Sequence, residues 1–314
     1  MSNKLWILGC AFSLLLFSCK KDDKISDPLP IEPDYVLPQG NASQAANDRI
    51  QQLYDNYGSY FLYNYTQKDF VWVQYTGSSA GAIDTAVLGD PQYAEDMLKF
   101  LDDIWLQFLP ESFKKGPAIP YRVFLADTIK QYRVGLRPPL THLFFDYKIS
   151  GKSLAIAGMN ASLRTMTPAE KVAKRNVLLP IIFNYYISNG IITLPAEFYT
   201  ISDYATVPAN PATSPENMAA WRSRGFLPSS YNAVTGAPFE WYYSYLWGNV
   251  TTYLPTMRTN DVNAYLLHLM QRTDAQVADF LAYPIIKKKW DLLLNHFKNS
   301  YGIDLRAIGN TTYQ

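Results

Sequence analysis

Apolar positions along the chain recur at helical spacing in some segments and as short continuous runs in others. Ile50 and Leu53 lie on one face of a helix predicted over 47–57, which Gly58 ends. A second helix is predicted to begin at Pro91, with an apolar stripe along one face. Runs rich in apolar, aromatic and β-branched residues predict strands at 70–75, 121–125, 142–145 and 153–157.

The clearest local signal marks the start of a long helix over 167–189. Thr167 can cap its first turn, and Glu170 completes a capping box three residues later. Gly190 follows as its stop. Pro180 lies in its interior, where it removes a backbone hydrogen bond and costs about 3 kcal/mol in an isolated helix. We therefore expect a kink at this proline.

Helices dominate the rest of the chain. Helical patterns occur at 216–224, 238–250, 262–272 and 284–301, and the proline-rich stretch 203–215 is predicted to be a loop. Strands and helices do not alternate as in repeated βαβ units. This order indicates an α+β fold, with a small N-terminal mixed sheet and its helices followed by a mainly helical C-terminal part. We expect a single domain over 41–314.

The first residues have the pattern of a secretory signal peptide over 1–18. Lys4 provides a positive charge, and the apolar run from Leu5 to Phe17 is too short to span a bilayer. The run ends in Leu-Phe-Ser-Cys19, which resembles a bacterial lipobox, so Cys19 is predicted to become the lipidated N-terminus. The alternative is a plain signal peptide with an incidental cysteine.

The segment 19–40 is predicted to be a lipidated tether. Its charged start, Lys20 to Lys24, resembles the tether that carries Bacteroidetes-type lipoproteins to the outer face of the outer membrane. Four prolines between 28 and 38 predict an extended, semi-rigid spacer. We expect an outer-membrane lipoprotein facing the cell exterior, anchored to the membrane by its lipid. The alternative is a solvated linker that does not direct the protein to any location.

Composition narrows the class of protein. Hydrophobic residues make up 48% and charged residues 18% of the chain, which supports a sizeable core and excludes wholesale disorder. A net charge of +1 means that the chain lacks the excess of basic residues typical of nucleic-acid binding. Three histidines, at 142, 268 and 296, are not spaced for a shared site, and each is expected to have a structural role. The lysine run 287–289 is interpreted as a solvated helix face.

Residues from about 48 to 306 resemble the substrate import-associated zinc metallohydrolases, a family of Bacteroidetes-type lipoproteins. The resemblance rests on the order of local stretches, which are Trp105-Leu106, Val123 to Ala126, the capped helix, Leu194 to Phe198, Arg224-Gly225-Phe226, Pro238-Phe239-Glu240 and Tyr301 to Leu305. It implies a zincin-like metallopeptidase fold. It also implies an accessory place beside an outer-membrane nutrient importer, with a TonB-dependent importer and its lipoprotein as partners and a glycan or peptide as ligand.

In that family the capped helix carries His-Glu-x-x-His, in which two imidazoles bind zinc and the glutamate acts as general base. Here Ile181 and Tyr185 stand at the histidine positions, and Ile182 stands at the position of the base. Isoleucine neither coordinates a metal nor moves a proton. No histidine occurs between 142 and 268, so no shift of the alignment restores the motif. We expect no metal, no cofactor and no catalytic residue.

Other positions of the family site are partly retained. Glu240 falls at the third-ligand position, and Tyr231 falls near the tyrosine expected to stabilise an oxyanion. Ser244 replaces a second carboxylate one turn after Glu240. A single glutamate cannot hold zinc. In the alternative interpretation, Glu240 is a carboxylate at a helix N-terminus and Tyr231 is a packing or rim residue.

Three functions are compatible with these features. The leading one is a binding protein on an inactive zincin fold, with an aromatic groove that includes Phe183, Tyr185, Tyr186 and Trp241. The second is a hydrolase with a non-standard metal site or a carboxylate pair. The candidate carboxylates are Glu197, Asp203, Glu216 and Glu240. The third is a structural surface lipoprotein whose cleft is filled by side chains.

Overall fold

The computed structural model describes residues 32–70, 83–132, 142–205, 214–228, 239, 241 and 250–314. The chain divides into two compact units, Met1–Val36 and Leu37–Gln314, and the second contains every described helix and strand. The signal segment, Cys19, Tyr231, Ser244 and Glu240 lie outside the described residues. Among the described helices, none has an apolar stretch long enough to cross a bilayer.

The first elements are α2 (Gln44–Tyr57), β1 (Tyr60–Leu62) and α3 (Gln67–Phe70). The side chain of Ser43 caps α2 by accepting a hydrogen bond from the Ala46 amide, and Gly58 ends the helix with a φ of 65°. A left-handed residue at this position favours glycine, as the sequence indicated. Phe70, the first residue of the strand predicted over 70–75, is instead the last residue of α3. Residues 71–75 lie outside the described residues.

The described strands form one mixed sheet of six strands, β1, β2 (Ile83–Leu88), β3 (Arg122–Tyr132), β4 (His142–Phe145), β5 (Tyr147–Ser150) and β6 (Ser153–Ile156). The first half of β3 pairs in parallel with β1 and β6. Its second half pairs antiparallel with β2 and β4, and β5 continues the sheet antiparallel to β6. The long central strand therefore organises the sheet. This sheet and the helices after it confirm the predicted α+β class.

Between β2 and β3 the chain forms η3 (Pro91–Tyr93), α4 (Ala94–Ile104), η4 (Leu106–Phe108), α5 (Glu111–Phe113) and η5 (Lys114–Ala118). The helix predicted to begin at Pro91 is thus a short 3₁₀ turn followed by α4. The Asp90 side chain caps this turn by accepting a hydrogen bond from the Gln92 amide. Met97, Leu101 and Ile104 are fully buried on one face of α4.

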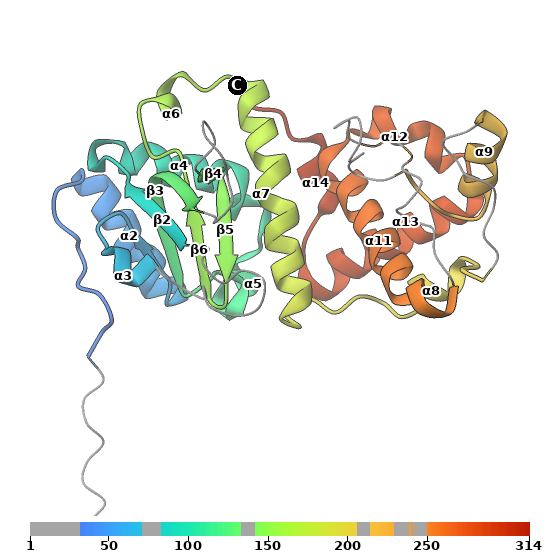
Figure 1. Ribbon diagram of the computed structural model, residues 1–314, viewed down its shortest axis with the longest axis horizontal. Coiled ribbons are helices and arrows are strands. Elements are labelled where there is room, and N and C mark those ends of the chain that lie inside the picture. Colours follow the sequence, from blue (N-terminus) through green and yellow to red (C-terminus); the bar gives the residue numbers. More distant parts are fainter. Residues whose placement is uncertain are drawn as a thin grey trace, which may run out of the picture. The chain divides into compact units, whose positions relative to one another are not determined.

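After the short α6 (Ser162–Thr165), the long helix α7 spans Pro168–Ser188. Both hydrogen bonds of the predicted capping box are present, between Thr167 and Glu170. Gly190, with a φ of 68°, follows the helix. The helix continues through Pro180 as one element. Figure 1 shows α7 between the sheet and the C-terminal helices, and it contacts α4, β5 and α11.

The C-terminal part is helical (Figure 1), with α8 (Phe198–Ile201), α9 (Pro215–Ser223), α11 (Val250–Gln271), α12 (Asp274–Leu281), α13 (Pro284–Tyr301) and α14 (Leu305–Asn310). Within it, α13 contacts α8, α9, α12 and α14, while α11 contacts α14. One continuous hydrophobic core joins this part to the sheet through the buried residues of α7. Because α7 has buried residues on several faces, it is held by tertiary packing rather than by a single amphipathic stripe.

Candidate functional site

The three positions of α7 that the sequence resemblance aligns with His-Glu-x-x-His have different environments. Ile182 is fully buried in the core, and Tyr185 is 9% exposed. Ile181 is half-buried and lines a cavity. Ile181 and Tyr185 therefore both border an open space, whereas Ile182 faces the core.

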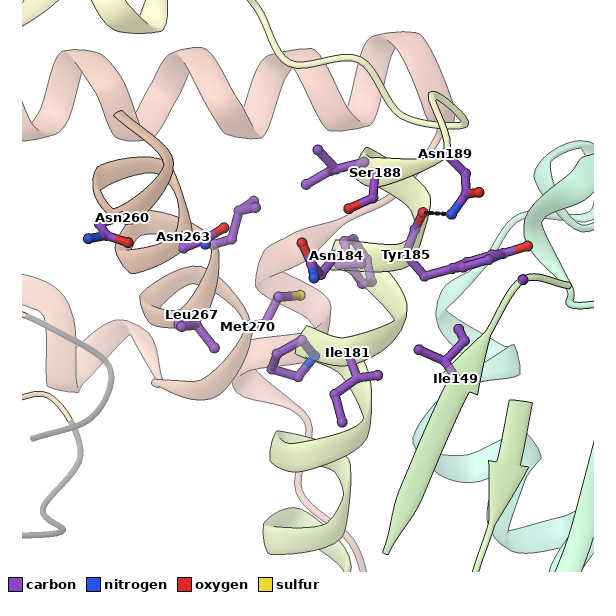
Figure 2. A pocket seen from close by; sticks show the side chains of 15 residues that line it. Ile149, Ile181, Asn184, Tyr185, Ser188, Asn189, Asn260, Asn263, Leu267 and Met270 are labelled. Carbon is purple, nitrogen blue, oxygen red and sulfur yellow. Dashed lines mark hydrogen bonds between the residues drawn. The ribbon is translucent and has the colours of Figure 1, made fainter. Parts of the chain in front are cut away.

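This space, called the α7–α11 groove below, has a volume of about 590 Å³. Its lining comes from α7 and the residue after it (Pro180, Ile181, Phe183, Asn184, Tyr185, Ile187, Ser188 and Asn189), from α11 (Asn260, Asn263, Leu266, Leu267 and Met270) and from the β5–β6 hairpin (Ile149 and Gly151). In Figure 2, Asn184 lies on the side of α7 that faces α11, whereas the ring of Tyr185 lies on the side of Ile149. The groove therefore extends over both sides of the helix.

Uncharged polar side chains are concentrated in the groove. Asn184 and Ser188 are exposed and lie one turn apart on α7, and Asn263 is half-buried on α11. None of these three side chains is hydrogen-bonded to a residue in the described part of the chain. Asn189 differs, because its Nδ2 donates to the Tyr185 carbonyl over 2.9 Å. At least three polar groups are thus available to a ligand.

The groove has no formal charge in its described lining. Tyr185 is the only ionisable side chain among the described lining residues, and burial raises its pKa above the usual value. Its phenol is therefore uncharged at neutral pH. Ile181, Leu267 and Met270 add apolar surface beside the amides. A site of this chemistry suits an uncharged ligand that has both hydroxyl or amide groups and apolar faces.

The groove residues do not fit the zinc ion that the sequence resemblance implies. Zinc in proteins is held by imidazole, thiolate and carboxylate groups. The groove face of α7 instead presents Ile181, Asn184, Tyr185 and Ser188. Within the described residues there is also no group of three or more His, Cys, Asp or Glu side chains that could hold a metal.

The aromatic residues expected to form one groove are placed in different surroundings. Phe183 borders the α7–α11 groove but is 1% exposed, and Tyr186 is fully buried with its hydroxyl accepting from Trp105 Nε1 at 3.2 Å. Trp241 packs in a separate cluster that includes Trp221, with ring centroids 6.2 Å apart. The structure thus brings Phe183 and Tyr185 together at the groove. Trp241 and Tyr186 are not among its described lining residues.

The described candidate carboxylates do not line the groove. Asp203 forms an ion pair of 2.7 Å with Arg224. Glu216 lies in the first turn of α9, where hydrogen bonds from its own backbone amide and from Ser214 lower its pKa. Glu197 occupies the N-cap position of α8. The fourth candidate, Glu240, lies outside the described residues.

A buried charge cluster next to the groove residue Asn260 was not predicted. Lys289 Nζ and Asp261 Oδ2 are 2.5 Å apart, and both side chains are fully buried. Tyr204 donates its hydroxyl proton to the same carboxylate oxygen. The ammonium group also donates to Ser202 Oγ at 3.0 Å and lies 4.3 Å from the ring centroid of Phe198. Lys289 therefore is not part of a solvated face, which corrects the interpretation of the lysine run.

Burial raises the pKa of Asp261 and lowers the pKa of Lys289, and the attraction between the two groups opposes both shifts. Asp261 follows the groove residue Asn260 on α11, and Lys289 lies on α13. The ion pair consequently joins α11 to α13.

The three histidines are separated in space. His268 is fully buried, with Nε2 3.3 Å from the Pro228 carbonyl and Nδ1 3.4 Å from Arg272. Burial, with a smaller effect from Arg272, lowers the pKa of His268 to about 3. His296 contacts the Thr193 carbonyl, and His142 lies in β4. None of them lines the groove as described.

Comparison with known proteins leaves the family open. No protein-family model matches the chain, and no curated protein matches it. A crystal structure from Bacteroides caccae named as a "putative zinc-binding metallo-peptidase" is similar over 85% of this chain and 91% of that chain. The sequence identity is 14% and the TM-score is 0.45. A similarity of this degree does not assign the chain to a family or an activity.

Proposed function

We propose that this protein is a cell-surface lipoprotein with a catalytically inactive, zinc-metallopeptidase-like domain, whose α7–α11 groove binds a small uncharged ligand. The observation that carries the proposal is the chemistry of the groove, where unpaired amide and hydroxyl groups lie beside apolar side chains. Concave sites with a few convergent polar groups on an apolar lining are typical of small-molecule binding. The volume of about 590 Å³ is within the range of such sites.

The residues at the motif positions support binding rather than hydrolysis. General acid–base catalysis requires a titratable group within hydrogen-bond reach of the reacting atoms. Ile182, at the position of the family's base, is an alkyl side chain directed into the core. Ile181 and Tyr185 face the groove but offer no metal ligand of the kind that a zinc hydrolase uses.

The place of the protein in the cell is the second part of the proposal. Cys19 at the end of the apolar leader supports a lipid anchor in the outer membrane, and the charged tether after it supports display on the cell exterior. On this basis the groove serves an outer-membrane import system for glycans or peptides. A TonB-dependent importer and its lipoprotein are the proposed partners.

Ligand-observed NMR tests the binding function directly. The full-length protein in detergent is mixed with uncharged oligosaccharides and with end-capped tripeptides, and saturation transfer to each probe is recorded. We expect transfer to at least one probe class, and its loss in Asn184→Trp, which fills the groove. Asn295→Trp, at an exposed position on α13, is the matched control and should retain the signal. Binding that Asn184→Trp leaves unchanged would exclude the groove as the site.

The same samples separate binding from catalysis. A binding protein leaves every probe intact over a day at room temperature, and chelator changes neither the signal nor the melting temperature, because a metal bound to the native state would add stability. Product peaks that disappear in Glu197→Gln, Asp203→Asn, Glu216→Gln or Glu240→Gln would instead favour the carboxylate hydrolase. Products lost on chelation would favour a non-standard metal site.

The lipid anchor is tested by metabolic labelling with a radioactive fatty acid. Cys19→Ala should abolish labelling and release the protein from the membrane fraction. Cys10→Ala is the matched control, since this residue lies within the apolar leader and should leave labelling unchanged. Continued labelling of Cys19→Ala would contradict the assignment. Resistance of the wild-type protein to external protease in intact cells would contradict surface display.

A further inference from the structure

We infer that the ligand of the α7–α11 groove is a short, uncharged oligosaccharide. This inference rests on the proposed binding function and specifies its ligand class. It is carried by three properties of the groove, which are the dual hydrogen-bonding capacity of its amides, the apolar surface beside them and the missing countercharge in its described lining.

The amides provide the first property. Asn184 on α7 and Asn263 on α11 line the same groove from two helices, and neither is bonded to a residue that the structure describes. Each amide group offers a carbonyl acceptor and two N–H donors, and the Ser188 hydroxyl both donates and accepts. Sugar hydroxyls also donate and accept. Figure 2 shows Asn184 and Asn263 on the two helices that line the groove, so sugar hydroxyls can be paired with amides from both walls.

The apolar surface provides the second property. Ile181, Leu267 and Met270 line the groove among the polar groups. A sugar ring presents C–H groups on its faces and hydroxyls around its edge. This distribution matches a site in which hydrophobic side chains lie beside convergent amides, because each kind of ligand surface then meets its own kind of partner.

The missing countercharge provides the third property. An ionised group that leaves water needs a partner of opposite charge or several hydrogen bonds. Among the described lining residues only Tyr185 can ionise, and burial raises its pKa. A uronic acid, a sulfated sugar or a peptide with free termini would lose solvation without gaining an ion pair. Uncharged sugars avoid this loss.

A peptide is the competing occupant. In the described sheet β5 pairs with β6 alone, so its other edge could accept an added strand, and Ile149 on β5 borders the groove. However, β5 has only four residues, and most of the lining comes from α7 and α11. The available hydrogen-bonding groups in that lining are side-chain amides and a hydroxyl rather than a free backbone edge. The observations therefore favour the saccharide.

The experiment is a two-step binding assay on the full-length protein in detergent. An array of neutral oligosaccharides, including maltotriose, cellotriose, xylotriose, mannotriose and chitotriose, identifies a binder. Calorimetry then gives its Kd beside those of trigalacturonic acid and an end-capped Ala-Ser-Ala tripeptide. We expect at least one neutral sugar to bind and the acid to bind at least 10-fold more weakly.

Two variants locate the sugar in the groove. Asn184→Leu and Asn263→Leu keep the approximate side-chain size but remove hydrogen bonding, and each should raise the Kd by about 5- to 10-fold. Asn295→Leu is the matched control, because it makes the same change at an exposed position on α13. It should leave the Kd unchanged. Equal melting temperatures of the variants ensure that a lost contact, not a lost fold, is measured.

The outcomes separate the inference from the function on which it rests. Tighter binding of the acid, or no neutral sugar bound anywhere on the array, overturns the saccharide assignment. Peptide binding that weakens in Asn184→Leu, without sugar binding, overturns it while the groove remains a binding site. Probe binding that neither groove variant changes overturns both the ligand class and the proposed site.

Discussion

Gln271 Nε2 donates a hydrogen bond of 2.7 Å to the backbone carbonyl of Asn176, the carbonyl that Pro180 leaves without its helical donor. In a regular helix the amide of residue 180 would bond to the carbonyl four residues earlier, but proline has no N–H. A side chain from the last residue of α11 replaces the missing donor. This contact gives the Asn176 carbonyl a hydrogen-bond donor and joins the two helices that form the groove.

The first prediction concerns this replacement. Gln271→Leu should lower the free energy of unfolding by about 1 kcal/mol, because it leaves a part-buried carbonyl without its hydrogen-bond partner. In a Pro180→Ala background the new alanine amide can bond to the same carbonyl, so the loss should be smaller. Urea unfolding of the four proteins measures the difference. Equal losses in the two backgrounds would show that the glutamine does not compensate for the proline.

The second prediction concerns the buried pair of Lys289 and Asp261. Lys289→Met should destabilise the fold by about 3–5 kcal/mol, because it leaves a buried carboxylate without its countercharge. The double variant with Asp261→Leu should be less destabilised than Lys289→Met alone, since no uncompensated charge remains. Chemical denaturation of Lys289→Met, Asp261→Leu and the double variant checks this. If the losses simply add, the two charges are not coupled.

The same single variant should have a distinctive pH dependence. With its partner removed, the Asp261 carboxyl has a native-state pKa raised further above the unfolded value of about 3.9. A raised carboxyl pKa means that the native state holds the proton more tightly. The deficit of Lys289→Met relative to wild type should therefore be smallest below about pH 4 and grow as the pH rises. A deficit that is constant from pH 3 to pH 7 would contradict this.

His268 provides the third prediction. Its pKa is lowered from 6.5 to about 3 in the native state, so unfolding in mild acid allows the ring to bind a proton that the native protein excludes. This contribution to stability is complete above about pH 6.5 and is lost as the pH falls toward 3. The stability lost between pH 6.5 and pH 4.5 should be about 2–3 kcal/mol. His268→Gln should lack this part of the pH profile, as measured by urea unfolding at each pH.

The fourth prediction concerns the introduction of a His-Glu-x-x-His motif into α7. Ile181→His should be tolerated, because this side chain is half-buried at the groove. Ile182→Glu should destabilise the protein by several kcal/mol, roughly the 1.5–3 kcal/mol of a buried isoleucine plus the cost of an unpaired polar group. The triple variant with Tyr185→His should be less stable than wild type and inactive on casein. Zinc-dependent proteolysis by the triple variant would contradict this prediction.

The fifth prediction compares two glycines with positive φ. Gly225 has a φ of 85°, and a Cβ there would lie 2.4 Å from Ile285 Cγ2 and 2.8 Å from Ser202 Oγ. Gly58 has a φ of 65° with no atom within 4 Å of an added Cβ. Gly58→Ala should therefore cost about 1 kcal/mol of backbone strain. Gly225→Ala should cost clearly more, because steric clash adds to the strain, and thermal unfolding of both variants measures the difference.

Much of the helical framework was predictable because its signals are local. Thr167 and Glu170 define the start of α7, and Gly58 and Gly302 end α2 and α13 in left-handed conformations. A helix cap or stop depends on residues only a few positions away, so it can be predicted from the local sequence. The order of elements then indicated the α+β class. The resemblance-based expectation of a zincin-like fold remains a prediction.

The strands were harder to predict because a strand depends on its partners. The pattern predicted a short strand over 121–125, whereas β3 extends from Arg122 to Tyr132. Its additional residues pair with β2 and β4, and neither pairing is evident from local sequence. The strands β1, β2 and β5 were missed for the same reason. Strand propensity expresses packing against neighbours, and neighbours are set by the fold.

For the candidate site, too, the sequence predicted only local features. The sequence alone determined that Ile181, Ile182 and Tyr185 offer neither an imidazole nor a carboxylate, and their alignment with the family's motif remains a prediction. Asn184 and Ser188 one turn apart on a predicted helix were a signal of a polar face, but nothing local linked them to Asn263. Only the packing of α7 on α11 decided that these side chains border one groove, and only tertiary structure placed Asp261 beside Lys289. Local patterns determine helix ends and single residues, whereas sites form where segments distant in sequence pack together.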